Sequence, residues 1–494
     1  MQARQLGSRR ELFVDDDFFL TTGTAVFDLH KPVMREVALR RDGAGDDAWT
    51  SYYNIIFDGE KYMMYYTAHG WEGEMEGKWP HQHICCAESR DGVHWEKPNY
   101  GIYEFHGTTD NNIVYLLKDD LLDNFGAMYD TNPACPADER YKALAERVIN
   151  DKVVLNAVTS PDGVHWTDRG TVITEGTFDS LNTCYYDEEA GKYHAYVRSW
   201  ETHIPSRNLG ESDEQLDQTP KGAEKTRTIS AFISDDFYHW TPLGPLDFAD
   251  RPAYQLYSNN IAPYYRAPQF IFGFPTRYFD RTYEPILHEI GHHRWLSAEE
   301  FGPDSCIRSE TSMTDGLFMS SRDGVNFKRF DDTPFFPSGI EGRRNWIYGD
   351  AYPCHGMVQS PSDREGEPDE ISMFVPDTLY GVLRRCTIRL DGFVSLHAGY
   401  TETELLTKPF IFEGSRLEFN YSTTVAGYFK AELLDENKNP FPGLSMSDCW
   451  DMYGDTVSRD VCWNGRRDVS AAAGKKCYMR IRMKECDLFS FRFH

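Results

Sequence analysis

The stretch Ser89-Arg90-Asp91-Gly92-Val93-His94-Trp95 returns along this chain. Each full copy begins with Ser, has Asp two residues later and ends on an aromatic residue, and a shorter fifth copy keeps only Asp-Gly and an aromatic. The later copies span residues 160–166, 234–240, 321–327 and 390–394. Measured between their Asp residues, successive copies lie 71, 74, 87 and 68 residues apart. Repeats of this kind indicate a fold assembled from similar units.

The chemistry of the repeat predicts a tight turn at the end of a β-strand. Ser and Asp side chains accept hydrogen bonds from turn amides, and Gly adopts the positive φ angles that tight turns need. Short apolar runs precede the first four copies, at residues 83–87, 155–158, 228–233 and 317–319. A spacing of about 70 residues is too long for a solenoid repeat and suits one four-stranded sheet with long loops. Five copies therefore predict a five-bladed β-propeller.

The rest of the sequence extends this all-β prediction. We expect residues 1–47 to be an extended segment that packs on the propeller and helps to close it, and residues 48–394 to form the propeller itself. Residues 395–494 lack the repeat but alternate strand-like runs with Gly, Asp and Asn turns, which predicts a C-terminal β-sandwich. Within the propeller, residues 200–226 are expected to form a loop and residues 280–300 a helical excursion.

Composition excludes several classes of partner. The 494 residues carry a net charge of −27, so an anionic nucleic acid or membrane surface would be repelled over most of the protein. No apolar run approaches membrane-spanning length, and the first ten residues lack the apolar centre of a signal peptide. The 11 cysteines have no motif spacing, which predicts buried, reduced thiols in a cytoplasmic protein.

Polar residues near the innermost predicted strands form the candidate site, because these strands meet at a central funnel in a propeller. Asp130, Asp179 and Asp350 occupy comparable places in their sheets and are the predicted catalytic carboxylates, although each also suits turn capping. Carboxylates that share a funnel acquire different pKa values, as acid and base catalysis on a glycosidic bond requires. Neighbouring side chains suit sugar hydroxyls and ring faces and are the predicted substrate-binding residues: Asn182, Arg198, Tyr257, Asn259, Asn260, Arg277, Asn345 and Trp346.

Two histidine patterns leave metal binding open. His288, Glu289 and His292 match the His-Glu-x-x-His pattern of zinc proteases, but the residues after them lack the usual further ligands, so an exposed polar helix is the alternative. His69, His81 and His83 surround an acidic loop, which suits either a divalent metal or a solvated surface.

Several further stretches carry a resemblance to a known family. They lie at residues 12–16, 130–133, 140–143, 178–182, 314–324, 345–350, 383–393 and 407–409, and include Asp130-Thr131-Asn132-Pro133 and Tyr348-Gly349-Asp350. On these motifs, nearly the whole chain resembles uncharacterised proteins related to the five-bladed β-propeller glycoside hydrolases, broadly similar to glycoside hydrolase families 32 and 43. The motifs are specific to the family but not to a substrate.

The resemblance implies a hydrolase with three carboxylates from different blades: a base or nucleophile, an acid, and one that adjusts pKa or steadies charge. Asp130 and Asp179 match the inner-strand acids of the family, and Asp350 lies in its Tyr-Gly-Asp motif. The chain departs from the family in the first blade, where residues 50–53 lack the Asp of well-studied relatives. Asp47, Asp16 or a loop Glu would then substitute, or the chemistry is not ordinary hydrolysis.

The predicted function is therefore that of a glycosidase, which cleaves a small oligosaccharide or glycoside without an organic cofactor, with a divalent metal left open. Two other classes of function stay open on the same fold. One is a metal-dependent enzyme that modifies carbohydrate, such as a sugar deacetylase with ligands from the His69 region. The other is a propeller that binds glycans without catalysis. Phosphorolysis, which would require phosphate, is a further alternative.

Overall fold

The structure is a computed structural model of the chain that describes all residues except 48, 70–81, 118–121, 123, 203–224, 250, 252–253, 282–311, 342–344 and 378–380. The described residues form strands, one short 3-10 helix (η1, Ala137–Glu139) and no α-helix, so the predicted all-β class is confirmed. The helix expected at residues 280–300 lies almost entirely outside the described residues. None of the helices among the described residues is long and apolar enough to cross a membrane.

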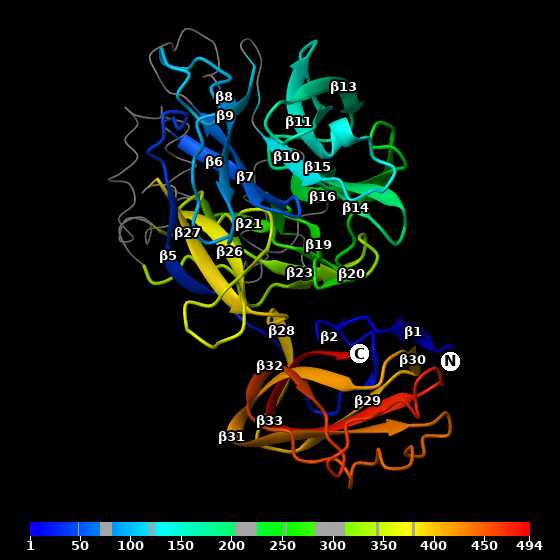
Figure 1. Ribbon diagram of the computed structural model, residues 1–494. Coiled ribbons are helices and arrows are strands. Elements are labelled where there is room, and N and C mark those ends of the chain that lie inside the picture. The colour runs from blue at the N-terminus through cyan, green and yellow to red at the C-terminus, as the bar shows by residue number, and fades with distance from the viewer. Residues whose placement is uncertain are drawn as a thin grey trace, which may run out of the picture.

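Residues 33–389, which we call the multi-sheet unit, contain a succession of four-stranded antiparallel sheets (Figure 1). The first sheet has β6 (Trp49–Phe57), β7 (Tyr62–His69), β8 (Gln82–Ser89) and β9 (Ile113–Leu116). The second has β10 (Phe125–Tyr129), β11 (Tyr141–Ile149), β12 (Lys152–Ser160) and β13 (Thr167–Ile173). The third has β14 (Thr183–Asp187), β15 (Lys192–Thr202), β16 (Lys225–Ser234) and β17 (Trp240–Pro245).

The next part of the unit is divided in two. β19 (Ala262–Tyr264), β20 (Ala267–Gly273), β23 (Phe318–Ser321) and β24 (Phe327–Phe330) form a four-stranded sheet. β18 (Gln255–Leu256), β21 (Thr276–Asp280) and β22 (Ser312–Gly316) form a three-stranded one. The two sheets lie along the same stretches of chain and separate at Pro275, because proline has no amide hydrogen to continue the ladder.

The last four-stranded sheet combines distant parts of the sequence. It contains β25 (Val358–Ser360), β26 (Glu370–Asp377) and β27 (Val382–Arg389), and its fourth strand is β5 (Val33–Arg40) from near the N-terminus. β27 pairs antiparallel with β5, for example Thr387 with Val33. The backbone of His355, just before β25, bonds to Tyr53 and Ile55 of β6, so the last sheet adjoins the first.

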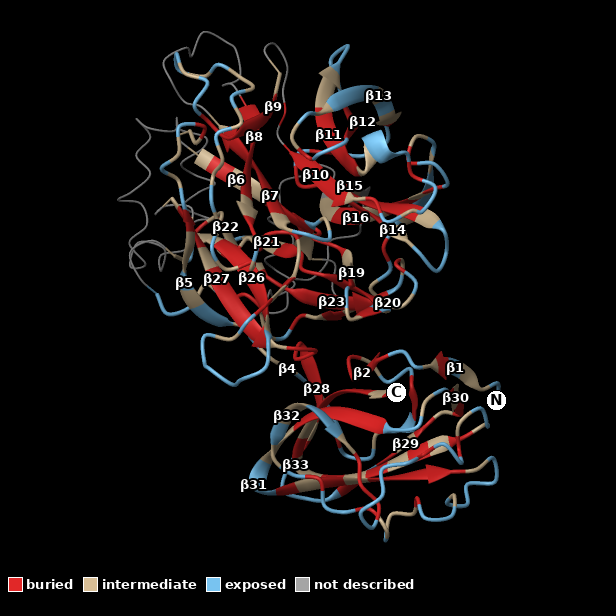
Figure 2. Cartoon of the chain, viewed as in Figure 1, coloured by how far each residue is buried: buried red, intermediate tan, exposed pale blue. Residues whose placement is uncertain are grey.

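The inner strands are buried on both faces, which explains their continuous apolar runs. All residues of β8 from Gln82 to Ala87 are buried, whereas the outer strand β13 is largely exposed and polar (Figure 2). The outer strand β17 is also largely exposed and contains two prolines, which cannot donate to another strand. Polar outer edges discourage pairing with other chains. The ten cysteines in the described part of the chain are buried and form no disulfide with one another.

The four full copies of the repeat form the tight turns that the sequence predicts. In the second copy, Ser160 Oγ accepts a hydrogen bond from the Gly163 amide (2.9 Å), and Asp162 Oδ1 accepts from the amides of Val164 (2.9 Å) and His165 (2.8 Å). The other three copies have the same bonds. Gly163 has a φ of 76°, which an L residue rarely adopts.

These turns also join neighbouring sheets. Tyr65 of the first sheet donates its hydroxyl to the carbonyl of Gly163 in the second (2.8 Å). Tyr196 of the third sheet does the same to Gly324 in the next (3.0 Å). The turns follow the third strand of each sheet, at the end where the first strands also finish. We call this the tag end, and the opposite end, where the first strands begin, the start end.

Residues 394–493, together with residues 4–29, form a second unit, which we call the C-terminal unit. Eight of its strands belong to one hydrogen-bonded sheet: β2 (Glu11–Leu12), β3 (Phe19–Thr21), β4 (Val26–Leu29), β28 (Val394–Ala398), β29 (Thr403–Thr407), β31 (Leu417–Leu434), β32 (Asp455–Asp460) and β33 (Tyr478–Phe493). The sequence predicted two facing sheets here. The pairing register of β31 and β33 breaks between Thr423 and Tyr428, as at a β-bulge.

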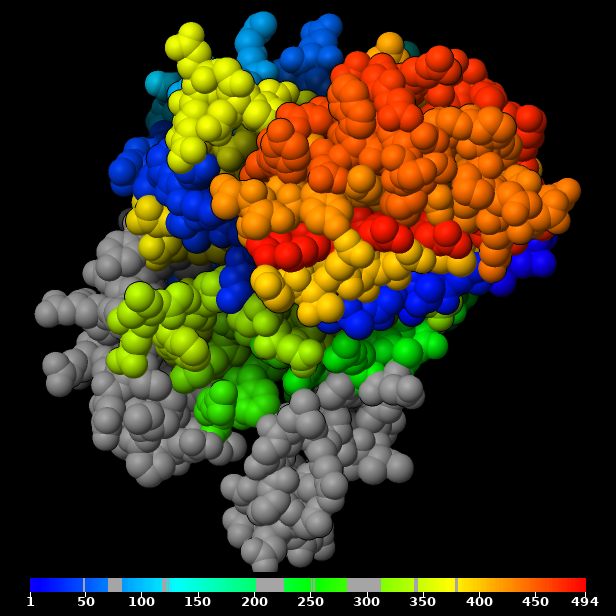
Figure 3. All heavy atoms as spheres, turned by 90° about the horizontal axis from the view of Figure 1, so that it is seen from below, coloured from blue at the N-terminus to red at the C-terminus, as the bar shows by residue number. Residues whose placement is uncertain are grey.

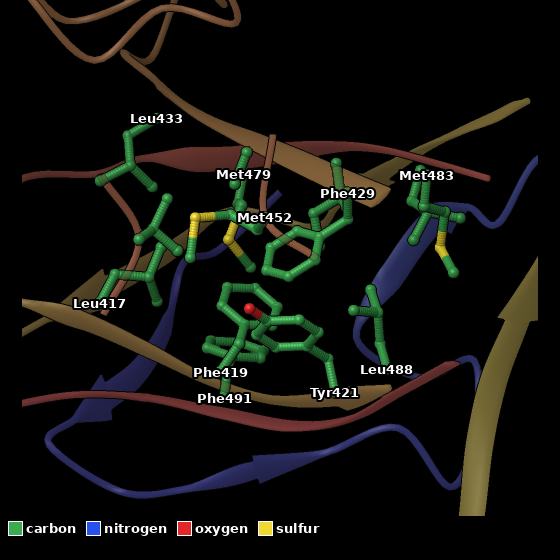
Figure 4. Packing of buried hydrophobic residues seen from close by; sticks show 14 of the residues in the cluster. Leu417, Phe419, Tyr421, Phe429, Leu433, Met452, Met479, Met483, Leu488 and Phe491 are labelled. Carbon is green, nitrogen blue, oxygen red and sulfur yellow. The ribbon is translucent and has the colours of Figure 1, made fainter. Parts of the chain in front are cut away.

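Aromatic and aliphatic side chains fill the interior of the C-terminal unit. Phe419, Phe429 and Phe491 are fully buried and contact one another, with ring centroids 4.8 and 5.6 Å apart for the two pairs that include Phe419 (Figure 4). Trp463 is also fully buried, and its indole nitrogen donates to the carbonyl of Ala431 (2.9 Å). Such a core indicates that the unit folds around its own apolar cluster.

Residues 1–47 contact both units. Leu12 and Val14 lie in one apolar cluster with Phe270 and Phe272 of the multi-sheet unit, whereas most strands of this segment pair with the C-terminal unit. β1 (Arg4–Gly7) pairs in parallel with β30 (Phe410–Phe412), and β2, β3 and β4 join the eight-stranded sheet of the C-terminal unit. Figure 3 shows these residues, in blue, running along the C-terminal unit. Only β5 pairs with the multi-sheet unit. The physical reason is that β28, β29 and β30 offer unpaired edges that these strands cover.

The fifth copy of the repeat lies at the junction of the two units. Asp391 is fully buried there and contacts Arg266 (2.8 Å) of the multi-sheet unit and Arg10 (3.3 Å) of the C-terminal unit. It also accepts hydrogen bonds from Tyr264 (2.7 Å) and Ser490 (2.6 Å). The C-terminal unit therefore attaches at the tag end and leaves the start end uncovered by it.

Candidate active site at the start end

Asp179 lies just before β14 at the start end. Its side chain is 54% exposed and forms an ion pair with Arg198 of β15, whose side chain is only 3% exposed. The hydroxyl of Tyr52, at the start of the first sheet, donates to the Asp179 carbonyl (3.1 Å). A depression of about 420 Å³ borders Asp179 and is lined by residues 152–153, 174 and 176–179. Asp179 is thus a solvent-accessible carboxylate that is ion-paired with the buried guanidinium of Arg198.

Asp350 is the second carboxylate at this end, and its surroundings differ. It lies in a turn where the Trp346 amide donates to its Oδ2 (2.8 Å), and its carbonyl accepts from Thr314 Oγ1 (2.6 Å). Burial raises the pKa of Asp350 to about 6, because a charged carboxylate is less stable away from water. A carboxyl group with such a pKa can donate a proton near neutral pH.

Aromatic rings connect the surroundings of the two carboxylates. The Arg198 guanidinium lies 5.4 Å from the ring centroid of Tyr257, which in turn lies 5.8 Å from that of Tyr348. Tyr348 belongs to the same turn as Asp350. The structure therefore brings together four of the predicted site residues at the start end: Asp179, Arg198, Tyr257 and Asp350.

Four non-glycine residues near the start end have positive φ angles. Tyr52, Asn260, Trp346 and Ala351 have φ angles of 50°, 46°, 64° and 52°, in the left-handed region that disfavours residues with a Cβ atom. Tyr52 lies in β6, and the other three residues lie in the connections that precede β19 and β25. Strain of this kind concentrates at functional sites, where the surrounding structure holds it in place.

Three predicted substrate-binding residues have buried side chains that bond to other parts of the protein. The side-chain amides of Asn182, Asn259 and Asn260 are buried and donate to other first strands or the residues before them: to Asn124 Oδ1 (2.7 Å), the Leu181 carbonyl (3.1 Å) and the Pro353 carbonyl (2.9 Å), respectively. These bonds join neighbouring sheets around the centre of the multi-sheet unit. Their observed contacts are structural.

Asp130 lies at the tag end, away from Asp179. It follows the last residue of β10, whereas Asn124, before the first residue, donates to the carbonyl of Phe178 beside Asp179 (2.6 Å). Six residues of extended chain correspond to about 20 Å. Asp130 is fully buried and contacts Lys142 (3.0 Å) and the Tyr193 hydroxyl (2.8 Å). The structure does not bring it together with the other two predicted carboxylates.

The remaining predicted residues have separate positions. Arg277 makes a two-point ion pair with Asp315 of the neighbouring strand. Asn345 donates to the carbonyls of Ser338 and Ile340 (2.7 Å each) and so fixes the turn that carries Asp350. Trp346 is 39% exposed on that turn, where its ring is available to a sugar.

The expected metal residues are described only in part. His69 is buried between Ser51 Oγ (2.8 Å) and the Gln82 amide (3.0 Å), and burial lowers its pKa to about 4, so it is neutral at physiological pH. His83 lies against the Gly45 carbonyl (2.7 Å). His81 and residues 288–292 fall outside the described residues. Within the described part of the chain, no three His, Cys, Asp or Glu side chains are grouped to hold a metal ion.

Sequence reasoning missed Tyr52, Trp200 and Arg227 at this end. Tyr52 interrupts the pairing of β6 with β7, and Trp200 and Arg227 face each other across β15 and β16. A signal for the last two existed: an arginine and a tryptophan lie at opposite ends of the polar stretch between two predicted strands.

Comparison with known proteins gives only distant likenesses. No protein-family model matches the sequence, and neither does any curated protein. Among solved structures, a glycoside hydrolase is similar with a TM-score of 0.44 at 10% identity, over 74% of this chain and 93% of its own. An N-acetylgalactosamine deacetylase from F. plautii has a TM-score of 0.39 at 13% identity (92% and 95%), and a fructofuranosidase from Schwanniomyces occidentalis 0.38 at 10% (93% and 96%). These likenesses assign neither a family nor an activity.

Proposed function

We propose that the multi-sheet unit is a five-bladed β-propeller in which the three-stranded sheet is the start-end part of the fourth blade. The closure of the last sheet by β5 supports this arrangement, because ring closure between chain ends removes exposed sheet edges. The C-terminal unit is then a β-sandwich formed by folding one sheet over at the register break of β31 and β33.

We propose that the protein is a glycoside hydrolase whose site lies at the start end. The observation that carries this proposal is the pair Asp350 and Asp179: one carboxyl group has a pKa raised by burial to about 6, and the other is exposed and paired with a buried arginine. Two carboxyl groups in such different environments suit acid and base chemistry on a glycosidic bond.

In this proposal each residue has a role that follows from its surroundings. Asp350 donates a proton to the leaving-group oxygen, and Asp179 is the base or nucleophile that Arg198 orients. The exposed ring of Trp346 stacks on a sugar face. Asp130 stabilises the fold through Lys142 and takes no part in the reaction.

The test is hydrolysis of a panel of nitrophenyl glycosides and natural oligosaccharides by the wild type and three variants, with and without a chelator. We expect Asp350→Asn and Asp179→Asn to lower turnover by about 10²-fold or more while remaining folded. Asp130→Asn is the matched control, with turnover per folded molecule kept and a lower unfolding temperature. Loss of turnover in Asp130→Asn at full stability, or full turnover in Asp350→Asn, would contradict the proposal.

Two outcomes of the same experiment point to the other functions. Turnover that disappears with the chelator and returns with a divalent metal would favour a metal-dependent carbohydrate-modifying enzyme. Glycan binding without any turnover, unaffected by Asp179→Asn, would favour a non-catalytic binding protein.

A further inference from the structure

Arg227 is a partly exposed arginine at the start end that is surrounded by aromatic rings. It lies on β16 opposite Trp200 of β15, and its guanidinium carbon is 4.6 Å from the Trp200 ring centroid. The rings of Tyr278 and Tyr257 lie 5.1 and 5.4 Å from the same carbon. Its Nη1 donates to Gln255 Oε1 (2.6 Å), so the side chain is held in one position.

This guanidinium has no carboxylate partner among the described residues. Its Nε atom is buried and makes no hydrogen bond. Other buried or half-buried arginines of the multi-sheet unit are paired: Arg277 with Asp315, and Arg329 with Asp331. A half-buried guanidinium that lacks a counter-ion and has a buried, unbonded nitrogen is unfavourable, and a ligand or ion that completes its contacts explains it.

A second guanidinium shares the same rings. The Arg198 guanidinium carbon lies 5.6 Å from the Trp200 centroid and 5.4 Å from that of Tyr257. Its one carboxylate partner in the described part of the chain is Asp179, and its Nε and Nη1 atoms are buried without a hydrogen bond. Asp179 therefore pairs with Arg198, and among the described residues no carboxylate pairs with the neighbouring Arg227 guanidinium.

We propose that the substrate carries a carboxylate, as a uronic acid residue does, and that Arg227 binds it beside Asp179. The inference rests on the proposed function and specifies its substrate class. A planar carboxylate matches the edge of a guanidinium, and the neighbouring Trp200 ring suits the face of the same sugar. A neutral sugar would leave the Arg227 guanidinium without a carboxylate partner.

The test measures binding and turnover of matched pairs that differ only in the carboxylate, such as nitrophenyl glucuronides and glucosides, or galacturonides and galactosides. Calorimetry with the Asp350→Asn variant gives binding, and product release by the wild type gives turnover. We expect a uronide to bind, and roughly tenfold to hundredfold more tightly than its neutral partner. Arg227→Gln should abolish this preference.

Two further variants separate charge from folding. Arg227→Lys keeps the charge without the planar fork and should retain part of the preference at wild-type unfolding temperature. Arg364→Gln removes one positive charge from an exposed position and should leave the preference unchanged.

The outcomes are distinguishable from those that test hydrolysis. Uronide binding that depends on Arg227, without cleavage, would overturn the proposed hydrolase and support this inference. Cleavage of neutral glycosides with no preference for uronides would support the proposed hydrolase and overturn this inference. Equal binding within each pair, or binding of inorganic phosphate or sulfate in place of the uronide, would overturn the assignment of a substrate carboxylate.

Discussion

The two ends of the multi-sheet unit differ in how completely their charged groups are hydrogen-bonded and ion-paired. At the tag end, Asp162 accepts two backbone amides, and Asp391 is enclosed by two arginines and two hydroxyl groups. At the start end, Asp350 is buried at a raised pKa, and the described contacts of Arg198 and Arg227 leave buried nitrogen atoms without hydrogen bonds.

This difference distinguishes charged groups that stabilise the fold from charged groups that are suited to catalysis. A carboxylate whose charge is satisfied by its neighbours strengthens the fold and has little tendency to exchange a proton. A carboxyl group with a raised pKa, at the same end as an arginine that has no carboxylate partner among the described residues, destabilises the fold locally but is ready to react. The same substitutions made at the two ends should therefore have different consequences.

The largest expected effect is on catalysis, from Asp350→Asn. We expect kcat/KM on any cleaved glycoside to fall by about 10²- to 10⁴-fold, because the proton donor is lost. In the wild type, kcat/KM should fall as pH rises through about 6, the pKa of Asp350. A pH–rate profile checks this: the variant should lack the falling limb, and a limb unchanged in the variant would show that another group is the acid.

The stability of the same variant sharpens the comparison. The folded-state pKa of Asp350 lies above the ordinary value of 3.8, so ionisation destabilises the fold as pH rises above about 4, with the full cost present above about 6. Asp350→Asn should thus unfold at an equal or higher temperature than the wild type at pH 7, and at a similar temperature at pH 4.

The next effect is on the junction of the units, from Asp391→Ala. Removing one member of a buried ion cluster leaves Arg10 and Arg266 without their counter-ion, which should lower the free energy of unfolding by about 3–5 kcal/mol. Chemical denaturation measures it. The exposed Asp363→Ala is the control and should change the free energy of unfolding by less than about 0.5 kcal/mol. A similar small value for Asp391→Ala would mean that the junction contributes little.

A smaller effect is expected in a tag turn, from Gly163→Ala. The new Cβ would lie 2.6 Å from the Tyr65 hydroxyl and 2.9 Å from the Met63 sulfur, at a φ of 76°. We expect a loss of roughly 1–3 kcal/mol in unfolding free energy. Gly59→Ala, whose φ is 101° and whose Cβ would meet no atom within 4 Å, isolates the backbone cost. Equal losses in both variants would exclude a contribution from the contact with Tyr65.

The smallest effect is expected from Asp162→Asn, the tag-end counterpart of Asp350→Asn. Partial burial alone would raise the pKa of Asp162, but hydrogen bonds from the His165 amide, the His165 ring and the Val164 amide outweigh it and lower the pKa to about 2. The stability that this provides is present above about pH 4 and is lost as pH falls through about 2. The variant should lose about 1 kcal/mol at pH 7 and keep full turnover, with a flatter acid limb in its stability profile.

Local turn chemistry made the tag end predictable from sequence. Ser, Asp and Gly at fixed spacing determine the same hydrogen bonds wherever they occur, so four turns could be located without any tertiary information. The start end depends on which way each strand runs. Asp130 follows the apolar run of its strand and Asp179 precedes one, a difference of order that places them at opposite ends.

The proximity of Arg227 to Trp200 and Arg198 could not be predicted from the sequence, for a different reason. Arg227 lies 27 positions after Trp200, and the two meet only because β15 and β16 pair in a particular register. The pairing partners of the N-terminal strands could not be predicted either. These partners lie beyond residue 393, and local sequence patterns do not reveal pairing at that range.

The pairing of the N-terminal strands with the C-terminal unit has a consequence for synthesis on the ribosome. Residues 4–29 are translated before the multi-sheet unit, yet the strands they join emerge only after the whole of that unit has been made. β5 likewise waits for β27. During this interval the leading segment has unsatisfied strand edges, which are prone to aggregation or to capture by chaperones. A pause or truncation late in translation would therefore release a product defective at its beginning as well as its end.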